Sequence, residues 1–336
     1  MWALGAGVFV GVMPIALLLA ALRCVLWPGS QRGLRLLAFA ALYLGLELVV
    51  MPMALGTWLA SGLGWALQRP AFVALHYRLF ALVIGVLVNC GSRTFALTIE
   101  RQWAGWPAQD ASTPAAGQPL LVLSRHAGPG DSMLLIHELF SRARRRPRIV
   151  LKHTLQWDPM IDLILNRLPM RFVNPAAQRQ GENVAAIARL ARTMTSGDAL
   201  LVFPEGGKVT PTRRRRAIDR LRRAGREQAA RRAESIRHLM PPKPRGLQAA
   251  LAARHDLDVV IVAHTGLDDL NTLPELWCAV ARDKTLHLRW HAVPAARVPR
   301  DPCGLAAWVF AEWERMDAWV GARRPMQPAR AAVTGW

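Results

Sequence analysis

Cysteine is scarce in this chain of 336 residues, and its four copies are far apart, at Cys24, Cys90, Cys278 and Cys303. No C-x-x-C pair occurs, which excludes a disulfide framework and a zinc site built on cysteine. We therefore expect the working side of the protein to face a reducing compartment.

Acidic residues are also few, with 23 Asp and Glu against 43 Lys and Arg and a formal charge of +20. This balance excludes an acidic protein and indicates anionic partners such as phosphate esters, nucleic acid or an acidic membrane surface. Lysine occurs only at Lys152, Lys208, Lys243 and Lys284, so arginine supplies most of the charge. A biased genome would produce this as readily as selection for phosphate binding.

Charge is nearly absent from the first part of the chain, and a hydrophobic fraction of 52% excludes a disordered protein. Met1 to Leu22 is uncharged and long enough to cross a bilayer, and it lacks the basic start and cleavage site of a signal peptide. Leu36 to Gln68 is a second apolar run, with Glu47 as its only formal charge. A third, Leu79 to Gly91, is short unless it begins near Ala71. We predict two or three membrane-spanning helices within residues 1–92.

The basic residues near these runs predict an orientation. Arg23, Arg32 and Arg35 lie between the first two runs, so the positive-inside rule places that connection in the cytoplasm. Three crossings would return the rest of the chain to the cytoplasm. We expect a multi-pass protein of the cell (inner) membrane with a cytoplasmic catalytic domain.

The remaining chain has the pattern of an α/β domain. Residues 93–119 contain a stretch rich in Pro, Ala and small polar residues, which predicts a linker before a domain at 120–322 and a tail at 323–336. Short apolar runs predict strands, and they alternate with helical patterns at Ser132–Arg144, Glu182–Ser196 and Leu305–Val320. The expected strands are Leu120–Ser124, Arg148–Lys152, Arg171–Asn174, Ala199–Phe203, Val259–Ala263 and Leu286–Trp290. The alternation predicts a sheet flanked by helices.

A His/Asp pair follows the first of these strands, in LSRHAGPGDSMLL. Gly and Pro keep the backbone out of a helix there, so His126 lies in a turn, and Asp131 is expected at the N-cap of the next helix. An imidazole held by a carboxylate is a general base that can activate a hydroxyl group. The pairs His153/Asp158 and His264/Asp269 have the same spacing but lack the strand, turn and helix around them.

A loop after another predicted strand carries the second motif, FPEGGK, at residues 203–208. Backbone amides and one cation in such a loop can bind an anion. The string FPEG is expected by chance only about 0.002 times in a chain of this length.

Together the two motifs resemble the glycerolipid acyltransferase family, and most closely its 1-acyl-sn-glycerol-3-phosphate (lysophosphatidic acid) acyltransferases. Members carry an H-x-x-x-x-D box, an FPEG box and an N-terminal membrane anchor, and the resemblance runs from about Leu120 to Thr265. It implies a mixed sheet flanked by helices and a helical N-terminal membrane anchor. It also implies acyl transfer from acyl-CoA or acyl carrier protein to a lysophospholipid hydroxyl, without a cofactor or a metal.

The resemblance also implies residue roles. His126 is the catalytic base and Asp131 its orienting partner. The expected binding residues for the acceptor are Lys152, Phe203, Pro204, Glu205, Gly206, Lys208 and Arg179. Lys152 and Lys208 match basic positions that hold the acceptor phosphate.

Three positions depart from the family pattern. Arg125 precedes the histidine where the family usually has Asn, and Lys208 replaces an arginine that could form a two-pronged phosphate contact. The family arginine after the Phe172 strand is missing, since Asn174 and Pro175 stand there and Arg179 is the nearest substitute.

A basic segment follows the second motif, with ten arginines against two acidic residues between Arg213 and Arg232. A helix on anionic lipid and a solvated charged face both fit this composition. Nucleic acid fits less well because no aromatic residues are interleaved.

The functional alternatives are an acyltransferase for another lysophospholipid or glycerolipid, a hydrolase, and a non-enzymatic basic protein that binds membranes or nucleic acid. A hydrolase with a catalytic triad would need a G-x-S-x-G nucleophile elbow, which is absent from the sequence.

Overall fold

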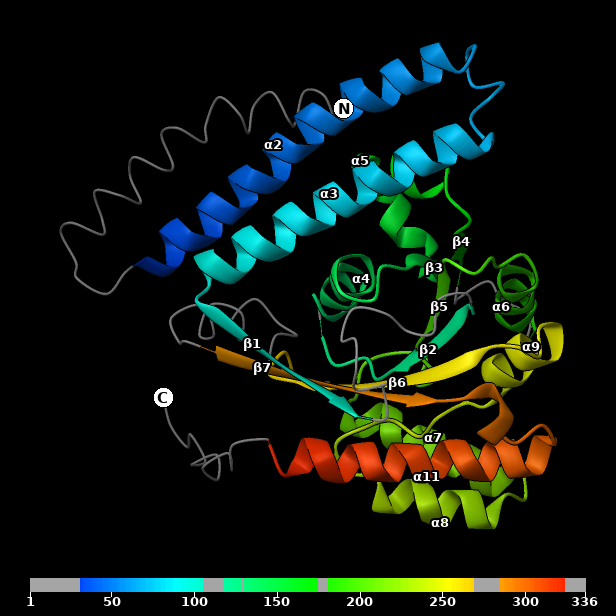
Figure 1. Cartoon of the computed structure of the whole chain (residues 1–336). Coiled ribbons are helices and arrows are strands. Elements are labelled where there is room, and N and C mark those ends of the chain that lie inside the picture. The colour runs from blue at the N-terminus through cyan, green and yellow to red at the C-terminus, as the bar shows by residue number, and fades with distance from the viewer. Residues whose placement is uncertain (1–30, 105–117, 129, 175–180, 269–283, 324–336) are drawn as a thin grey trace.

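A seven-stranded sheet forms the centre of the part of the chain that the computed structural model describes, residues 31–104, 118–128, 130–174, 181–268 and 284–323. The strand order is β1-β7-β6-β2-β5-β3-β4 (Figure 1). Neighbouring strands are parallel except for β6 and β7, which are antiparallel. The predicted α/β class with a mixed sheet flanked by helices is confirmed.

The strands are β1 (Leu97–Ala104), β2 (Leu120–Ser124), β3 (Arg146–Lys152), β4 (Arg171–Val173), β5 (Asp198–Val202), β6 (Asp258–Thr265) and β7 (Lys284–Val293). The α-helices are α2 (Gln31–Ala60), α3 (Pro70–Thr94), α4 (Asp131–Ser141), α5 (Pro159–Leu165), α6 (Glu182–Arg192), α7 (Pro211–Arg223), α8 (Glu227–Ser235), α9 (Arg245–Ala253) and α11 (Pro302–Gly321). Two 3₁₀ helices, η1 (His153–Trp157) and η2 (Ala295–Arg297), complete the described elements.

The central strands β2 and β5 are buried along their whole length. Strands covered on both faces are apolar in succession rather than alternately, which explains the run LLVLS in β2. Leu121 and Leu123 pack in a core with α6, α7, α8, α9 and α11. Leu120 and Val122 pack on the opposite face, with α3, α4 and α5 (Figure 1).

Strand β1 lies within residues 93–119, the stretch for which composition predicts a linker. Its sequence alternates, with Leu97, Ile99 and Trp103 packed against the core and polar residues between them. It pairs in parallel with β7, and Trp103 stacks on Trp290 with ring centroids 5.0 Å apart. The Pro- and Ala-rich part of that stretch, residues 105–117, lies outside the described residues.

Helices α2 and α3 are long and apolar enough to cross a membrane, judged by length and composition. On α2, the exposed apolar side chains include Leu48, Val49, Leu55 and Leu59. On α3, by contrast, one face is buried against α4, where the Phe80 ring packs edge-on against Phe140. The third predicted apolar run therefore begins at Pro70 and forms part of the core. The first predicted run, Met1 to Leu22, lies outside the described residues.

The pair of apolar helices is attached to the rest of the protein near α5. The Tyr43 hydroxyl on α2 donates to Asp158, which also caps α5 by accepting from the Ile161 N–H at 2.9 Å. Arg167 donates to the Ala54 carbonyl (2.8 Å) and to Thr57 Oγ1 (2.9 Å). These contacts attach α2 to the residues around α5.

Candidate active site

The first motif lies just beyond the carboxyl end of β2, and the second just beyond β5, its parallel neighbour. The carboxyl ends of parallel strands meet at one edge of a sheet, where α/β proteins bind their ligands. Lys152 is the last residue of β3, the next parallel strand, so it lies at the same edge. The topology thus brings three separate segments of the sequence to one place.

The turn after β2 depends on glycine at two positions. A Cβ on Gly128 would lie 2.5 Å from the Leu267 carbonyl oxygen, so no larger residue fits without a shift. Gly130 has φ of 92° and forms the N-cap of α4. The prediction that Asp131 is the N-cap was therefore wrong by one position. The Asp131 carboxylate instead turns back and accepts from the N–H groups of Ala127 (2.9 Å) and Gly128 (3.3 Å).

His126 and Asp131 form the predicted pair. His126 Nδ1 lies 2.8 Å from Asp131 Oδ2. A carboxylate only accepts hydrogen bonds, so Nδ1 carries the proton and Nε2 has a free lone pair in the neutral ring. The His126 side chain is 24% exposed and that of Asp131 only 1%. The geometry presents a basic nitrogen toward solvent while its orienting carboxylate stays buried.

Asp131 remains ionised despite its burial. Burial by itself raises the pKa of a carboxyl group, but the hydrogen bond from His126 and the Gly128 N–H outweigh it. The pKa of Asp131 therefore lies below its ordinary value. The negative charge is available to stabilise an imidazolium at His126.

The second motif packs directly against the first. The ring centroids of Phe203 and His126 are 5.1 Å apart, with the planes tilted by 44°. Glu205 is buried, and its Oε2 lies 3.4 Å from the His126 backbone nitrogen. Among the described residues, Glu205 Oε1 has no hydrogen-bond partner. A neutral carboxyl group tolerates such a position better than a carboxylate does.

The pKa of Glu205 is consistent with this neutral form. Burial raises its pKa to about 8, although Arg125, the His126 N–H and the Trp313 indole act in the opposite direction. The charge of Asp131 adds to the upward shift. At neutral pH the pair of buried carboxyl groups beside His126 thus carries one negative charge rather than two.

Arg125, the residue before the histidine, is buried and holds the turn in place. Its Nη1 donates to the His264 carbonyl at the end of β6 (2.8 Å), and its Nη2 pairs with Asp268. The other Asp268 oxygen accepts from Thr265 Oγ1 at 2.8 Å. Arg125 thus connects the ends of β2 and β6, a position from which its side chain fixes the backbone next to His126.

The other two His/Asp matches have different surroundings. Asp158, five residues after His153, is the cap of α5 described above. His264 is buried in β6, where its Nε2 lies 3.1 Å from the Arg125 carbonyl, and burial together with Arg125 lowers its pKa. A neutral, enclosed imidazole of this kind supports the turn. Its expected partner Asp269 lies outside the described residues.

The remaining predicted site residues are distributed around this edge. Lys152 is exposed, and Pro204 is buried behind the loop. Gly206 has φ of 68°, in the left-handed region that favours glycine. Lys208 lies five residues before Arg213, which donates to its carbonyl at 3.4 Å. Arg179 lies outside the described residues.

Four residues near these motifs contribute to the site and were not among the predicted site residues. In the sequence, Arg125 is a departure from the pattern of the family that the motifs resemble. A buried arginine needs hydrogen-bond or ion-pair partners, and the sequence does not reveal them. Trp313 reaches Glu205 from α11, more than a hundred residues away, and no local pattern signals this. Lys243 and Arg213 lie against the glycines of the second motif, as described below.

The comparisons with known proteins agree with this geometry. Residues 108–265 match the family model described as Acyltransferase. The comparisons with curated proteins and with solved structures found no match. The matched segment ends at Thr265, the last residue of β6, and includes both the His126–Asp131 pair and the loop at 203–208. Over this segment, which is just under half of the chain, the protein is therefore similar to the acyltransferase family.

Proposed function

We propose that the protein transfers a fatty acyl group from acyl-CoA or acyl carrier protein to the free hydroxyl of 1-acyl-sn-glycerol-3-phosphate, which yields phosphatidic acid. The observation that carries this proposal is the 2.8 Å contact between His126 Nδ1 and Asp131 Oδ2, inside the segment that is similar to the acyltransferase family. It leaves Nε2 as the base for a hydroxyl group.

The proposed reaction is a direct transfer. The acceptor oxygen bonds to the thioester carbonyl carbon while His126 Nε2 takes the hydroxyl proton. The tetrahedral intermediate then collapses, the carbon–sulfur bond breaks, and the imidazolium returns the proton to the leaving thiolate. The buried Asp131 carboxylate stabilises the imidazolium between these two steps. No nucleophilic side chain and no cofactor takes part.

The acceptor is proposed to lie along the same edge of the sheet. The ammonium groups of Lys152 and Lys208 would bind its phosphate, and Phe203 to Gly206 would form the wall beside the glycerol. Arg179 is a further basic residue proposed for the phosphate. A lysine contributes a point charge rather than a planar fork, so the phosphate contact is shared among several residues.

A lipid acceptor also explains the apolar helices. The exposed apolar side chains of α2 suit the hydrocarbon of a membrane, and their attachment to α5 keeps the domain beside it. We propose a location in the cell (inner) membrane, with several spans and the catalytic domain in the cytoplasm. The basic outer face of α7 would add attraction to anionic lipid headgroups.

The test is a panel of lysophospholipids incubated with radiolabelled acyl-CoA or acyl carrier protein and membranes that contain the protein. We expect labelled phosphatidic acid from the lysophosphatidic acid sample. Label in the product of another lysophospholipid alone would identify that lipid as the acceptor and refute our choice. Release of free fatty acid with no acceptor product would indicate a hydrolase.

A further inference from the structure

A cavity of about 160 Å³ lies beside the second motif and is lined in part by Glu205, which also contacts the His126 backbone nitrogen. Its walls come from the loop at 205–207, from α7 and from the segment before α9, which contributes Met240, Pro241 and Lys243. A single water needs only about 10–15 Å³ of such space, so the cavity has room for a phosphate group.

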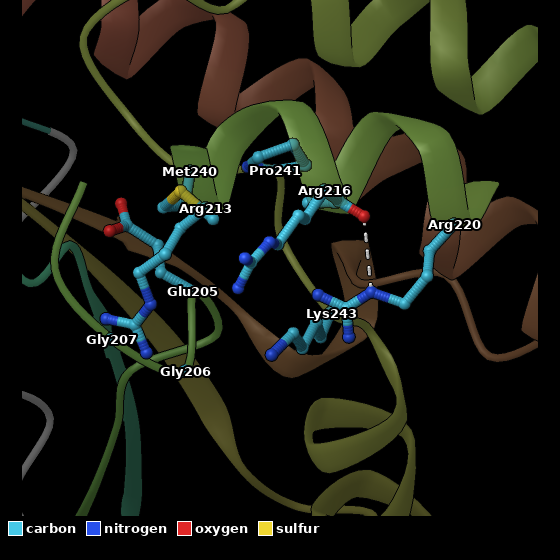
Figure 2. A pocket seen from close by; sticks show the side chains of 10 residues that line it. Glu205, Gly206, Gly207, Arg213, Arg216, Arg220, Met240, Pro241 and Lys243 are labelled. Atoms are coloured by element: carbon cyan, nitrogen blue, oxygen red, sulfur yellow. Dashed lines mark hydrogen bonds between the residues drawn. The ribbon is translucent and has the colours of Figure 1, made fainter. Parts of the chain in front are cut away.

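The basic lining comes from one face of α7. Arg213, Arg216 and Arg220 are three and four residues apart, which places them on the same side of the helix. Figure 2 shows the side chains of Arg216, Arg220 and Lys243 converging on the same hollow. The ten arginines of the basic segment thus have different surroundings, and three of them line this cavity.

Other arginines of α7 have different positions. Arg214 faces the protein, where it donates to the Ile236 carbonyl at 2.7 Å. Arg215 and Arg223 are exposed and do not line the cavity. They provide a natural comparison, because they carry the same charge on the same helix.

Four basic side chains line the cavity. Arg213, Arg216, Arg220 and Lys243 form no ion pair with any acidic side chain among the described residues. The Arg220 guanidinium donates to the Arg216 carbonyl at 3.3 Å. Desolvation and the nearby charges of Arg220 and Arg213 lower the pKa of Lys243. The acidic side chain in the lining, Glu205, is mainly neutral at pH 7, so these four basic side chains share the cavity with no carboxylate from the described residues.

The glycines of the second motif let two of these cations approach the loop. A Cβ on Gly206 would lie 2.7 Å from Lys243 Nζ, and a Cβ on Gly207 would lie 2.6 Å from the Arg213 guanidinium. Both glycines have positive φ, at 68° and 151°. The cations therefore occupy the space that side chains would fill, and they line the wall of the cavity next to the loop.

We propose that this cavity binds a phosphate group of the acyl donor, such as the phosphates of coenzyme A. Arginine side chains bind phosphate oxygens with paired, charge-assisted hydrogen bonds, and three arginines on one helix face can surround such a group. This inference rests on the proposed function, which supplies a donor that carries phosphates.

The position of the cavity favours the donor over the lipid acceptor. Helix α7 lies on the face of the sheet opposite to α3 and α4, and α2 lies beyond α3 (Figure 1). The acceptor must keep its acyl tail near the apolar surface of α2, whereas a water-soluble donor can enter from the side of α7. Glu205 lines the cavity, and its Oε2 lies 3.4 Å from the His126 backbone nitrogen, so a donor bound there lies near the reaction centre.

The test is calorimetric titration of the full chain in detergent micelles with coenzyme A, with pantetheine, which lacks phosphate, and with glycerol 3-phosphate. The variant is Arg216→Gln/Arg220→Gln, and its matched control is Arg215→Gln/Arg223→Gln, with the same charge change on the same helix. Lys243→Gln probes the opposite wall without changing α7. Melting curves establish that each variant is folded.

We expect Arg216→Gln/Arg220→Gln to weaken coenzyme A binding at least about tenfold, since each charge-assisted hydrogen bond to an ionised group is worth at least that factor. Lys243→Gln should weaken it several-fold. The control should change it less than about threefold, and the affinity of pantetheine should be the same in all proteins.

Equal losses of coenzyme A affinity in the variant and its control would mean that only the overall positive charge of α7 attracts the ligand, and this would overturn the proposal. Absence of coenzyme A binding by the wild-type protein would do the same. Competition by glycerol 3-phosphate that is lost in Arg216→Gln/Arg220→Gln would assign the cavity to the acceptor instead. The titration measures binding without turnover, so its result is independent of the lysophospholipid panel. Failure of acyl transfer in that panel would refute the proposed function but not coenzyme A binding in this cavity, and loss of this binding site would not refute acyl transfer.

Discussion

Glu205→Gln should change how the stability of the protein depends on pH, because a buried carboxyl group is replaced by an amide of the same shape that cannot ionise. Burial raises the pKa of Glu205 from 4.5 to about 8. At pH 7 about nine of ten folded molecules therefore carry the neutral acid, whereas the unfolded chain carries the carboxylate.

The direction of the effect follows from the number of bound protons. Between pH 4.5 and about 8, Glu205 binds one more proton in the folded state than in the unfolded state. The free energy of unfolding contributed by this group therefore falls as pH rises. The slope for one proton is about 1.4 kcal/mol per pH unit. This corresponds to roughly 2–4 °C of melting temperature per pH unit for a protein of this size.

Tryptophan fluorescence during heating of the full chain in detergent micelles measures this difference between pH 5.5 and 7.5. The melting temperature of the wild-type protein should fall more steeply with pH than that of Glu205→Gln. Glu182→Gln, an exposed position on α6, is the matched control and should follow the wild-type slope. Parallel curves for the wild-type protein and Glu205→Gln would refute the neutral form of Glu205.

Three further changes test other parts of the molecule. Asp131→Asn should lower the rate of acyl transfer about 10²- to 10⁴-fold with little change in KM, because the amide cannot stabilise the imidazolium; a milder effect in steady-state kinetics would count against its role. Lys208→Ala should raise the KM of the acceptor far more than that of the donor, and Lys208→Arg should be tolerated; equal changes in both KM values would place the acceptor phosphate elsewhere. Phe80→Ala should lower the free energy of unfolding by about 3–5 kcal/mol in denaturant titrations, because the Phe80 ring is buried against Phe140. Leu82→Ala, at an exposed position of α3, is the control and should leave the free energy of unfolding nearly unchanged. Equal free energies of unfolding for the two variants would mean that α3 is an anchor outside the core.

Local patterns were sufficient to predict most of the sheet. Strands β2 to β7 lie where short apolar runs predicted them, with ends that differ by a few residues. Strand β1 was not predicted because a Pro- and Ala-rich segment follows it directly, although Leu97, Ile99 and Trp103 alternate as a half-buried strand requires. Its partner β7 lies almost two hundred residues away, so its pairing has no local signal.

The same limit applies to the candidate site. The spacing of His126 and Asp131 was enough to predict their contact, since only four residues of one turn lie between them. The Arg125–Asp268 pair and the position of Trp313 beside Glu205 depend on contacts across the fold. The composition of the basic segment predicts a single charged face, whereas the position of α7 on the sheet gives its arginines three different environments.

The central claim is that His126 is the base for acyl transfer. The most direct measurement is the single-turnover rate of labelled acyl-CoA with lysophosphatidic acid for the wild-type protein and His126→Ala, with melting curves for both and His153→Ala as the control. We predict that His126→Ala loses about 10²- to 10⁴-fold or more of the rate at an unchanged melting temperature, and that His153→Ala has a much smaller effect. A His126→Ala protein that turns over at nearly the wild-type rate would contradict the mechanism.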